Sequence, residues 1–435
     1  MIVLFLPLSK GNLLEMLPIA KAMPDAMFCL NKKVASLASL IGDIPAISAD
    51  GSPLKDAQRP TPNAQKTSST KKKIYTYLPS GAKGFLQIRA ECRRAKKLFE
   101  SHKDIGLVIV SGDRSIGIET AVIAQANRKK IPSLIVPFAM SFREAAAEPR
   151  LRSGKRGGQY AVSNPLRYLL KLLFPSWIFV YKNTPLFFQP PYTALAAAML
   201  GIMPKNPWII GGGAASKMAV ESSALRDQLL VQGMPADKMI VTGKPSLDGI
   251  AELLKRDVDR SAKKIILCSV PNFGEHDLLP WDTHKEEMQF LFKTLAATGA
   301  TVQLSLHPRS DRAWYQPLAD EAGLEIRTES IYELLPRADI VISSYSSIIA
   351  QSIALHKPSV VIDFYGFDYP VYDGAPGTAV IKKKDELLPH FKRLIDDDSY
   401  YASCVTALKE KGSEWAMLDG KNTDRVVALV CELLA

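Results

Sequence analysis

Residues 2–23 read IVLFLPLSKGNLLEMLPIAKAM and already contain the unit from which the fold is built. The apolar run at 2–6 predicts a buried strand, and the polar SKGN at 9–12 predicts a turn. The apolar residues after the turn recur at helical spacing. A strand, a glycine turn and a helix in this order are the usual opening of an α/β domain.

The same pattern returns in both halves of the chain. LVIVSGD at 107–113 precedes a helical stretch, and PSLIVPFA follows at 132–139. A second series begins at IILCSV (265–270) and continues with TVQLSL, DIVIS and PSVVID, which are separated by helical patterns. This spacing is typical of βαβ units. Single cores stop growing at about 250 to 300 residues, so the chain of 435 residues is expected to form two domains. The βαβ spacing predicts that both are α/β and Rossmann-like, at 1–248 and 249–435. The polar stretch 249–264 is interpreted as the linker.

Residues 141–207 interrupt this rhythm and are interpreted as an insertion. A basic stretch at 142–160 is followed by an aromatic, apolar stretch that contains several prolines. Residues 183–204 carry no charge, but Pro185, Pro190 and Pro191 would leave backbone groups unpaired in lipid, so a transmembrane helix is not expected. An amphipathic segment in a membrane interface and a buried subdomain or dimer contact remain as alternatives.

The net charge of +11 is unevenly distributed. Residues 1–200 contain 29 Lys and Arg against 12 Asp and Glu, whereas residues 201–435 contain 26 against 32. This asymmetry favours a partner with negative charge, such as an anionic membrane surface, a lipid-linked phosphate or an acidic glycan. A solvated basic face is the alternative. No nucleic-acid-binding motif accompanies the charge, so nucleic acid is not expected as a partner. The basic side chains are densest at Lys71, Lys72, Lys73, Arg89, Arg93, Arg94, Lys96 and Lys97.

The five cysteines are scattered and form no Cys-x-x-Cys pair, which argues against a disulfide framework or a zinc site. The N-terminus lacks the basic region of a signal peptide. The sequence therefore predicts a cytoplasmic protein, with peripheral binding to the inner face of the cell membrane as a further possibility. No Asp-x-Asp motif for a nucleotide-bound cation is recognised, and neither a metal nor a cofactor is expected.

Four polar clusters in the second half follow predicted strands. If these strands adjoin, their carboxyl ends share one edge of the sheet and form a single pocket. The SSYSS segment at 343–347 precedes an apolar helix, so its hydroxyls and the N–H groups at the start of that helix can receive phosphate. A plain helix N-cap is the alternative for these serines. The predicted nucleotide or donor site consists of Ser269, Asn272, His307, Pro308, Arg309, Ser343, Ser344, Ser346 and Ser347, with Asp363 at a fourth strand end.

Several of these motifs resemble those of GT-B enzymes. The stretch at 224–248 (ALRDQLLVQGMPADKMIVTGKPSLD) is similar to the junction between their two domains. His307-Pro308 and the serine cluster resemble the H-P and S-S motifs of bacterial sialyl-, polysialyl- and capsule Kdo-type transferases, which use CMP-sugars. SSYSS followed by HKPSVVIDF (356–364) is also similar to CDP-glycerol glycerophosphotransferases. The ending at 415–434 resembles the tail of such surface-carbohydrate enzymes.

This resemblance implies two Rossmann-like domains with a cleft between them. It also implies a metal-independent, inverting glycosyltransferase of capsule or lipopolysaccharide synthesis. The donor would be a nucleotide-activated sugar, such as a nonulosonic acid or Kdo-like sugar from CMP, and the acceptor a cell-surface glycan or glycolipid. A CDP-polyol phosphotransferase is an alternative.

A second resemblance concerns Val110–Arg114, which is similar to the G-D-R segment of UDP-GlcNAc 2-epimerases. The chain lacks the R-P-E motif of that family after the first strand, and it has no His-x-Glu after the strand near 132–137. An epimerase is therefore the second hypothesis, and a non-catalytic protein that binds glycan or lipid is the third.

An inverting transferase of this fold needs a carboxylate in the N-terminal domain to deprotonate the acceptor. Asp113 is the first candidate for this base because it follows a strand that would face the cleft, and Glu144 and Glu148 are in reserve. His307 is assigned to the leaving phosphate or the cytidine ribose. The loop that contacts acceptor or phosphate is expected to comprise Ser9, Lys10, Gly11, Asn12 and Arg114.

Overall fold

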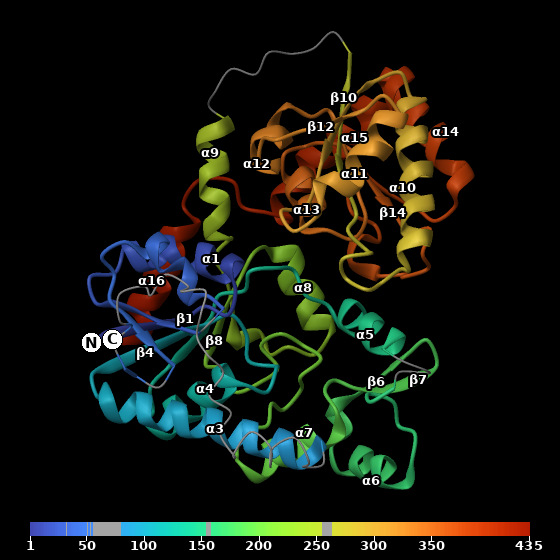
Figure 1. Cartoon of the computed structure of the whole chain (residues 1–435). Helices are drawn as coiled ribbons and strands as arrows, with labels where there is room; N and C mark the ends of the chain where they lie inside the picture. The colour runs from blue at the N-terminus through green and yellow to red at the C-terminus, as the bar shows by residue number, and fades with distance from the viewer. Residues whose placement is uncertain (32, 50, 53, 55–79, 154–157, 255–262) are drawn as a thin grey trace, which may run out of the picture. The chain divides into compact units, whose positions relative to one another are not determined.

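A computed structural model describes the chain except residues 32, 50, 53, 55–79, 154–157 and 255–262 (Figure 1). The chain divides into two compact units. Unit 1 comprises Met1–Val220, Leu229–Ser246 and Thr423–Ala435, and unit 2 comprises Glu221–Gln228 and Leu247–Asn422. Lys71, Lys72, Lys73 and part of the expected linker lie outside the described residues.

Unit 1 is built on a parallel sheet of seven strands in the order β3-β2-β1-β4-β5-β8-β9. Its first part has the strand order of a Rossmann fold. The strands are β1 (Ile2–Leu6), β2 (Ala26–Leu30), β3 (Ala46–Ser48), β4 (Ile105–Val110), β5 (Ser133–Ile135), β8 (Lys217–Val220) and β9 (Met239–Val241). The main helices are α1 (Lys10–Lys21), α3 (Ser80–Ser101), α4 (Ile118–Arg128) and α16 (Asn422–Leu434).

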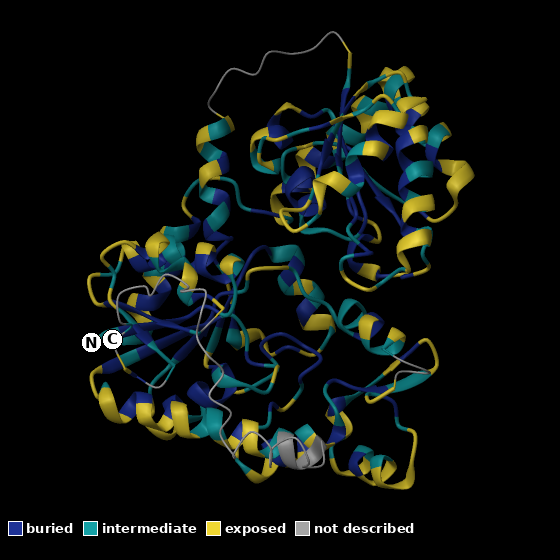
Figure 2. Ribbon diagram, viewed as in Figure 1, coloured by how far each residue is buried: buried dark blue, intermediate teal, exposed yellow. Residues whose placement is uncertain are grey.

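The central strands of unit 1 are buried on both faces, as Figure 2 shows in dark blue. Val3, Leu4 and Phe5 of β1 have no exposed surface, and β4 is similarly enclosed. Parallel strands covered by helices on both sides need continuous apolar runs of this kind, which is why IVLFL and LVIV were recognisable as strands.

The C-terminal helix belongs to unit 1, although the sequence placed all of residues 249–435 in the second domain. Val426, Leu429 and Val430 of α16 are buried in the core that contains Val3 and Phe5. These three positions form one apolar stripe of a helix. The stripe shows that the helix needs a partner, but it does not show which domain provides it.

Residues 141–207 form a subdomain of unit 1 between β5 and β8. The hairpin strands pair antiparallel, and the turn uses Lys182 and Asn183 with φ of 45° and 60°, as tight hairpins require. Leu170, Trp177, Phe187 and Ala194 form a separate buried cluster. The elements are α5 (Arg143–Arg152), α6 (Pro165–Leu173), β6 (Ile178–Tyr181), β7 (Thr184–Phe187) and α7 (Pro191–Met199).

Among the described residues, no helix combines the length and the apolar character needed to cross a bilayer.

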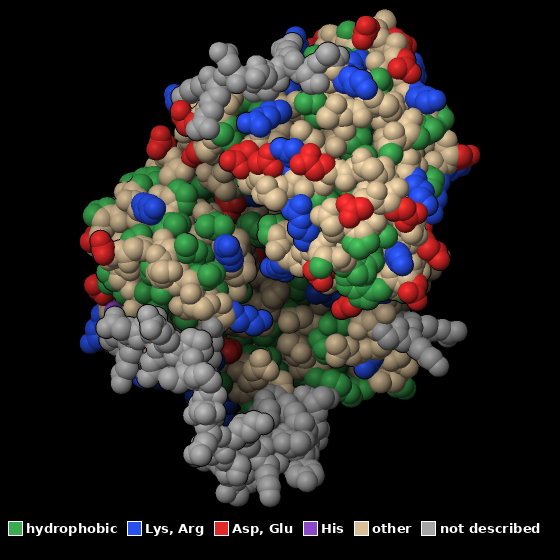
Figure 3. All heavy atoms as spheres, turned by 45° about the horizontal axis from the view of Figure 1, so that its top comes forward, with side chains coloured by type: hydrophobic (Ala, Val, Ile, Leu, Met, Phe, Trp, Pro, Cys, Tyr) green, Lys and Arg blue, Asp and Glu red, His purple; other side chains and the backbone are tan. Residues whose placement is uncertain are grey.

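Two helices of unit 1 have distinctive outer faces. On α3, the exposed side chains include Arg89, Arg93, Arg94, Lys96 and Lys97. On α6, five large apolar side chains are between 49% and 61% exposed, namely Leu166, Tyr168, Leu169, Leu172 and Leu173. Elsewhere, basic and acidic side chains are interspersed on the face drawn in Figure 3.

Unit 2 has a parallel sheet of six strands in the order β12-β11-β10-β13-β14-β15, which is again the order of a Rossmann fold. The strands are β10 (Ile265–Ser269), β11 (Thr301–Ser305), β12 (Glu325–Ile326), β13 (Ile340–Ser343), β14 (Ser359–Ile362) and β15 (Thr378–Ile381). Its helices are α9 (Asp248–Leu254), α10 (Trp281–Ala296), α11 (Arg312–Glu321), α12 (Ile331–Leu334), α13 (Ser347–Ala354), α14 (Lys384–Asp396) and α15 (Asp398–Lys411), and α8 (Ser223–Val231) begins in unit 2 and ends in unit 1.

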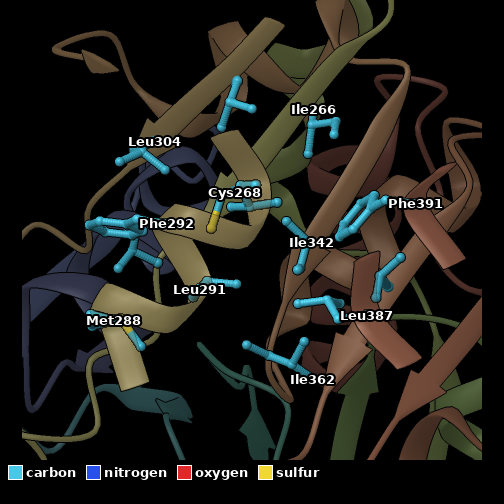
Figure 4. Close-up of a cluster of buried hydrophobic side chains, with 14 of the residues drawn as sticks. Ile266, Cys268, Met288, Leu291, Phe292, Leu304, Ile342, Ile362, Leu387 and Phe391 are labelled. Carbon is cyan, nitrogen blue, oxygen red and sulfur yellow. The ribbon is translucent and has the colours of Figure 1, made fainter. Parts of the chain in front are cut away.

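The core of unit 2 lies between its sheet and the helices that cover it (Figure 4). Ile266 and Ile342 of the strands pack with Phe292 of α10 and Phe391 of α14, and all four are fully buried. This core fixes the sheet, so the loops at the ends of its strands are held in defined positions.

Candidate active site

The four predicted polar clusters lie at one edge of the sheet of unit 2. β11, β10, β13 and β14 are neighbours in that order, and each pair is parallel. The residues at or just after their carboxyl ends are Ser269, His307, Ser343 and Asp363. In open α/β sheets, ligands bind at the carboxyl ends of the strands, next to the strand at which the strand order reverses. In unit 2 that strand is β10.

The serines at 343–347 differ in what their hydroxyls do. Ser343 donates to the backbone oxygen of Ser269 at 3.0 Å and so ties β13 to β10. Ser346 is the N-cap of α13, where its Oγ accepts from the N–H of Ile348 at 3.4 Å. The Oγ of Ser344 is buried and has no hydrogen-bond partner among the described residues. Ser344 and the N–H groups in the first turn of α13 are therefore available to an anion.

The loop after β14 is tied to this serine segment. Tyr345 donates its hydroxyl to Asp363 Oδ2 at 3.1 Å. Asp363 also accepts the N–H groups of Phe367 at 2.9 Å and Asp368 at 2.7 Å. Burial, together with the charge of Asp363, raises the pKa of Tyr345 and keeps the phenol neutral. Asp363 therefore positions the loops, and its carboxylate is already bound on both oxygens.

His307 is held as a neutral hydrogen-bond donor. Its Nδ1 accepts the N–H of Arg309 at 3.1 Å, so the proton of the neutral ring is on Nε2. Burial lowers the pKa of His307, and the nearby charges of Arg309 and His276 lower it further. Pro308 and Arg309 are exposed beside it.

The segment after β10 brings a second histidine to the same edge. Asn272 and His276 are hydrogen bonded, with 3.1 Å between Nδ2 and Nε2. The ring centroids of His276 and His307 are 6.4 Å apart. The sequence identified Asn272 but not His276, because a single histidine in a loop gives no signal that it meets another one 31 residues later.

The expectation that Asp113 faces the cleft from a strand end does not fit its burial. Its carboxylate accepts the N–H groups of Gly211 at 2.9 Å and Ala215 at 3.3 Å, and it forms an ion pair of 3.3 Å with Lys238. A Cβ on Gly213 would lie 2.2 Å from the backbone oxygen of Asp113, so the returning loop packs directly on it. Asp113 therefore holds this loop and is shielded from an acceptor.

The two reserve carboxylates on α5 differ in burial and in the number of their partners. Glu148 is buried and accepts from Tyr181, Arg152 and Lys182 at 2.6, 2.6 and 2.9 Å. Burial raises the pKa of Glu148, but these hydrogen bonds outweigh burial, and the pKa lies below its ordinary value. Glu144, in the first turn of α5, is half-buried and has no hydrogen bond or ion pair with the described residues.

The turn after β1 caps its own helix. The Oγ of Ser9 accepts the N–H of Asn12 at 3.3 Å and donates to Asn12 Oδ1 at 2.8 Å. A Cβ on Gly11 would lie 2.5 Å from the ring of Phe138, so this ring packs directly on the glycine. Capping and packing thus account for Ser9, Gly11 and Asn12, and Lys10 is left exposed to solvent.

A buried ion pair that the sequence did not reveal adjoins this turn. Lys244 lies 3.4 Å from Glu15, and both side chains are at most 5% exposed. The N–H and hydroxyl of Ser246 also donate to Glu15, at 3.1 and 2.6 Å. Burial raises the pKa of Glu15, and Lys244 opposes this effect. The pair ties α1 to the segment after β9.

No group of three or more His, Cys, Asp or Glu side chains in the described part of the chain is arranged to hold a metal ion.

Comparisons with known proteins agree with this architecture. Residues 222–432 match the family model of CDP-Glycerol:Poly(glycerophosphate) glycerophosphotransferase. The glycotransferase of kitacinnamycin has a TM-score of 0.56 at 14% identity, covering 100% of this chain and 99% of its own. The UDP-GlcNAc 2-epimerase from Neisseria meningitidis bound to UDP-GlcNAc has a TM-score of 0.53 at 15% identity, covering 99% and 100%. No curated protein matches the sequence. The chain has the GT-B fold.

The GT-B fold confirms the predicted fold class with its two Rossmann-like units. The family match covers the whole edge formed by Ser269, His307 and the serines at 343–347, which is where the sequence placed the nucleotide. The matched family is the CDP-glycerol family, one of the resemblances recognised in the sequence, and its name contains no CMP-linked sugar.

Proposed function

We propose that this GT-B protein is a transferase that uses a cytidine-diphosphate-linked polyol and passes its polyol phosphate to the hydroxyl of an acceptor. The observation that carries the proposal is the edge of unit 2 where His307 Nε2, Ser344 Oγ and the start of α13 offer hydrogen-bond donors. This edge lies within the residues that match the CDP-glycerol family. The match favours the CDP-polyol alternative over a CMP-linked nonulosonic or Kdo-like sugar.

The chemistry of this transfer explains why hydrogen-bond donors gather at this edge. The acceptor oxygen forms a bond to the phosphorus that carries the polyol, the bond from that phosphorus to the bridging oxygen breaks, and CMP leaves with the electron pair. Negative charge grows on the leaving phosphate. Hydrogen-bond donors that are already oriented stabilise such charge without reorganising, and the start of a helix adds its dipole. We assign this stabilisation to His307, Ser344 and α13, in a transfer that needs no metal.

The acceptor proton requires a base in unit 1, and we assign it to Glu144. Asp113 and Glu148, the other two predicted carboxylates, are enclosed by cations and N–H groups. Glu144 is half-buried on the first turn of α5 and has no partner among the described residues.

The epimerase hypothesis receives less support from the site. The G-D-R resemblance depends on Asp113, whose carboxylate is buried against a loop and paired with Lys238. An epimerase would need this group to exchange a proton with a sugar.

We further propose that the protein binds the anionic inner face of a membrane through α6, where a lipid-linked acceptor would be found. The support is the row of exposed leucines on α6 together with Arg167 and Lys171, on a helix without an acidic residue. Apolar side chains flanked by cations are typical of helices that lie in a membrane interface.

The function is tested by measuring CMP release from CDP-glycerol in the presence of a hydroxyl acceptor, and nucleotide affinity by calorimetry. His307→Asn should weaken binding of CDP-glycerol and lower turnover. His356→Asn is the matched control, because His356 has a φ of 57° that asparagine tolerates. Glu144→Gln should keep donor affinity and lose a factor of about 10² to 10⁴ in turnover. Preferred binding of UDP, or interconversion of UDP-HexNAc without acceptor, would overturn the proposal.

A further inference from the structure

Three arginines of unit 1 surround a group of aromatic rings at the carboxyl edge of its sheet. Arg114 follows β4, and Arg143 and Arg150 lie on α5, which follows β5. The Cζ atoms of Arg114 and Arg150 lie 5.5 and 4.1 Å from the centre of the Phe188 ring. The Cζ atom of Arg143 lies 5.3 Å from the centre of the Phe179 ring.

The aromatic rings connect the three guanidinium groups into one cluster. Phe179 and Phe188 both contact Trp208, with ring centres 5.2 and 5.3 Å apart. Arg150 also lies 5.6 Å from the centre of the Trp208 ring. Cation–π contacts hold the arginines in place but use none of their N–H groups in the ring plane.

The positive charge of this cluster is not neutralised by the carboxylates beside it. Glu148 is taken by Arg152 and Lys182. Asp113 is taken by Lys238 and two backbone N–H groups. Burial lowers the pKa of Arg114 to about 10, the charge of Arg150 lowers it further, and the charge of Asp113 opposes both effects. The guanidinium group stays charged at neutral pH, and a bound anion would stabilise that charge.

The hydrogen bonding shows which arginines have a structural role. Arg150 donates to the backbone oxygens of Phe188 and Ala146, so its position is explained by the protein alone. Arg114 makes no hydrogen bond to a described residue, and its Nη1 is buried. The Nε of Arg143 is also buried without an acceptor. A buried donor that finds no acceptor costs about 1–3 kcal/mol.

We propose that Arg114 and Arg143 form a binding site for a phosphate group of the acceptor, with Arg150 adding positive charge beside them. Phosphate supplies several acceptor oxygens and matches the planar fork of guanidinium groups. The proposal rests on the proposed function. It adds that the acceptor is recognised by a phosphate near the hydroxyl that reacts, as in a polyol phosphate.

The position of the cluster fits this role. Arg143 precedes Glu144, the proposed base, in the first turn of α5. An acceptor anchored by its phosphate at Arg143 would bring a neighbouring hydroxyl to the same turn, because a glycerol phosphate is only a few bonds long. Holding an acceptor in one orientation is itself a large part of catalysis.

The test measures binding of sn-glycerol 3-phosphate by calorimetry at constant ionic strength, without donor. Arg114→Gln and Arg143→Gln should each weaken binding about 10- to 100-fold, as expected for losing a charged hydrogen bond. Arg93→Gln, which removes an exposed cation of α3, should leave the affinity unchanged. Arg114→Lys keeps the charge but not the fork and should bind with intermediate affinity, which also covers the case that Arg114→Gln fails to fold.

The affinity for CDP-glycerol is measured on the same variants and should not change. Equal glycerol 3-phosphate affinity in the wild type and both glutamine variants would overturn the site. The glutamine variants could instead stop sedimenting with phosphatidylglycerol liposomes while their glycerol 3-phosphate affinity stays unchanged. That result would assign these arginines to a lipid headgroup and would also overturn the proposed acceptor site. If CDP-glycerol fails to bind while glycerol 3-phosphate binding depends on the arginines, the proposed function fails and the phosphate site stands.

Discussion

The carboxylates that follow β4 in unit 1 have very different environments. The sequence shows that Asp113 and Glu119 come after this strand, but it does not show what surrounds them. Glu119, in the first turn of α4, accepts the N–H of Ser111 at 2.6 Å and its hydroxyl at 2.8 Å. Burial raises the pKa of Glu119 to about 7, despite these hydrogen bonds. Asp113, six residues earlier, has Lys238 as its partner. The partner, and not the residue type, decides which carboxylate can act as a base.

Glu119 makes the stability of unit 1 depend on pH. Between the ordinary pKa of 4.5 and about 7, the folded protein keeps a proton that the unfolded chain loses, so the free energy of unfolding falls as pH rises through this window. One pKa unit corresponds to about 1.4 kcal/mol. Glu119→Gln cannot titrate, so its stability relative to wild type should improve by on the order of 1–3 kcal/mol from pH 5 to pH 8.

Urea unfolding at pH 5, 6, 7 and 8 measures this difference. Glu100→Gln is the control, since Glu100 is exposed and paired with Lys96 only on the surface. A constant difference between Glu119→Gln and wild type across these pH values would show that Glu119 does not titrate as described.

At the scale of elements, the sequence predicted best what depends on neighbouring residues. Apolar runs identified the strands, and SSYSS before an apolar stretch identified the start of α13. The burial of Asp113 escaped prediction because its partners Gly211 and Lys238 are 98 and 125 residues away. The sequence placed Arg114 in the acceptor or phosphate loop, but it did not reveal Arg143 and Arg150 beside it, since Arg114 meets α5 at the ring of Phe188.

The start of α13 allows capping and ligand binding to be separated. Ser346→Ala removes the N-cap hydroxyl and should lower the free energy of unfolding by about 1 kcal/mol. Ser344→Ala removes a buried hydroxyl that bonds to no described residue, so the free energy of unfolding should not fall while CDP-glycerol binding weakens about tenfold. Chemical denaturation and calorimetry on both variants check this. Unchanged donor affinity in Ser344→Ala would remove Ser344 from the donor site.

At the scale of the molecule, the chain passes between the two units several times, whereas the sequence predicted a single boundary between residues 248 and 249. Residues 221–228 and 229–246 belong to different units, and α16 returns to unit 1 at residue 423. Each unit has its own core, so two Rossmann-like domains were predictable from local patterns. The return of α16 was not predictable, because an amphipathic helix fits either core.

The membrane proposal is a prediction about the whole protein, because it needs both the leucines of α6 and the cations of unit 1. The protein should sediment with liposomes that contain phosphatidylglycerol and not with neutral ones. Binding should weaken as salt rises, since charges are screened over about 10 Å at 0.1 M. The double variant Leu169→Gln and Leu172→Gln removes two side chains that are 52% and 61% exposed, so it should bind several-fold more weakly without loss of stability. Val231→Gln is the control because Val231 is 87% exposed on a different helix, α8. Failure of the wild type to sediment with anionic liposomes at low salt would contradict the proposal, and equal binding of the double variant would show that α6 is not the contact.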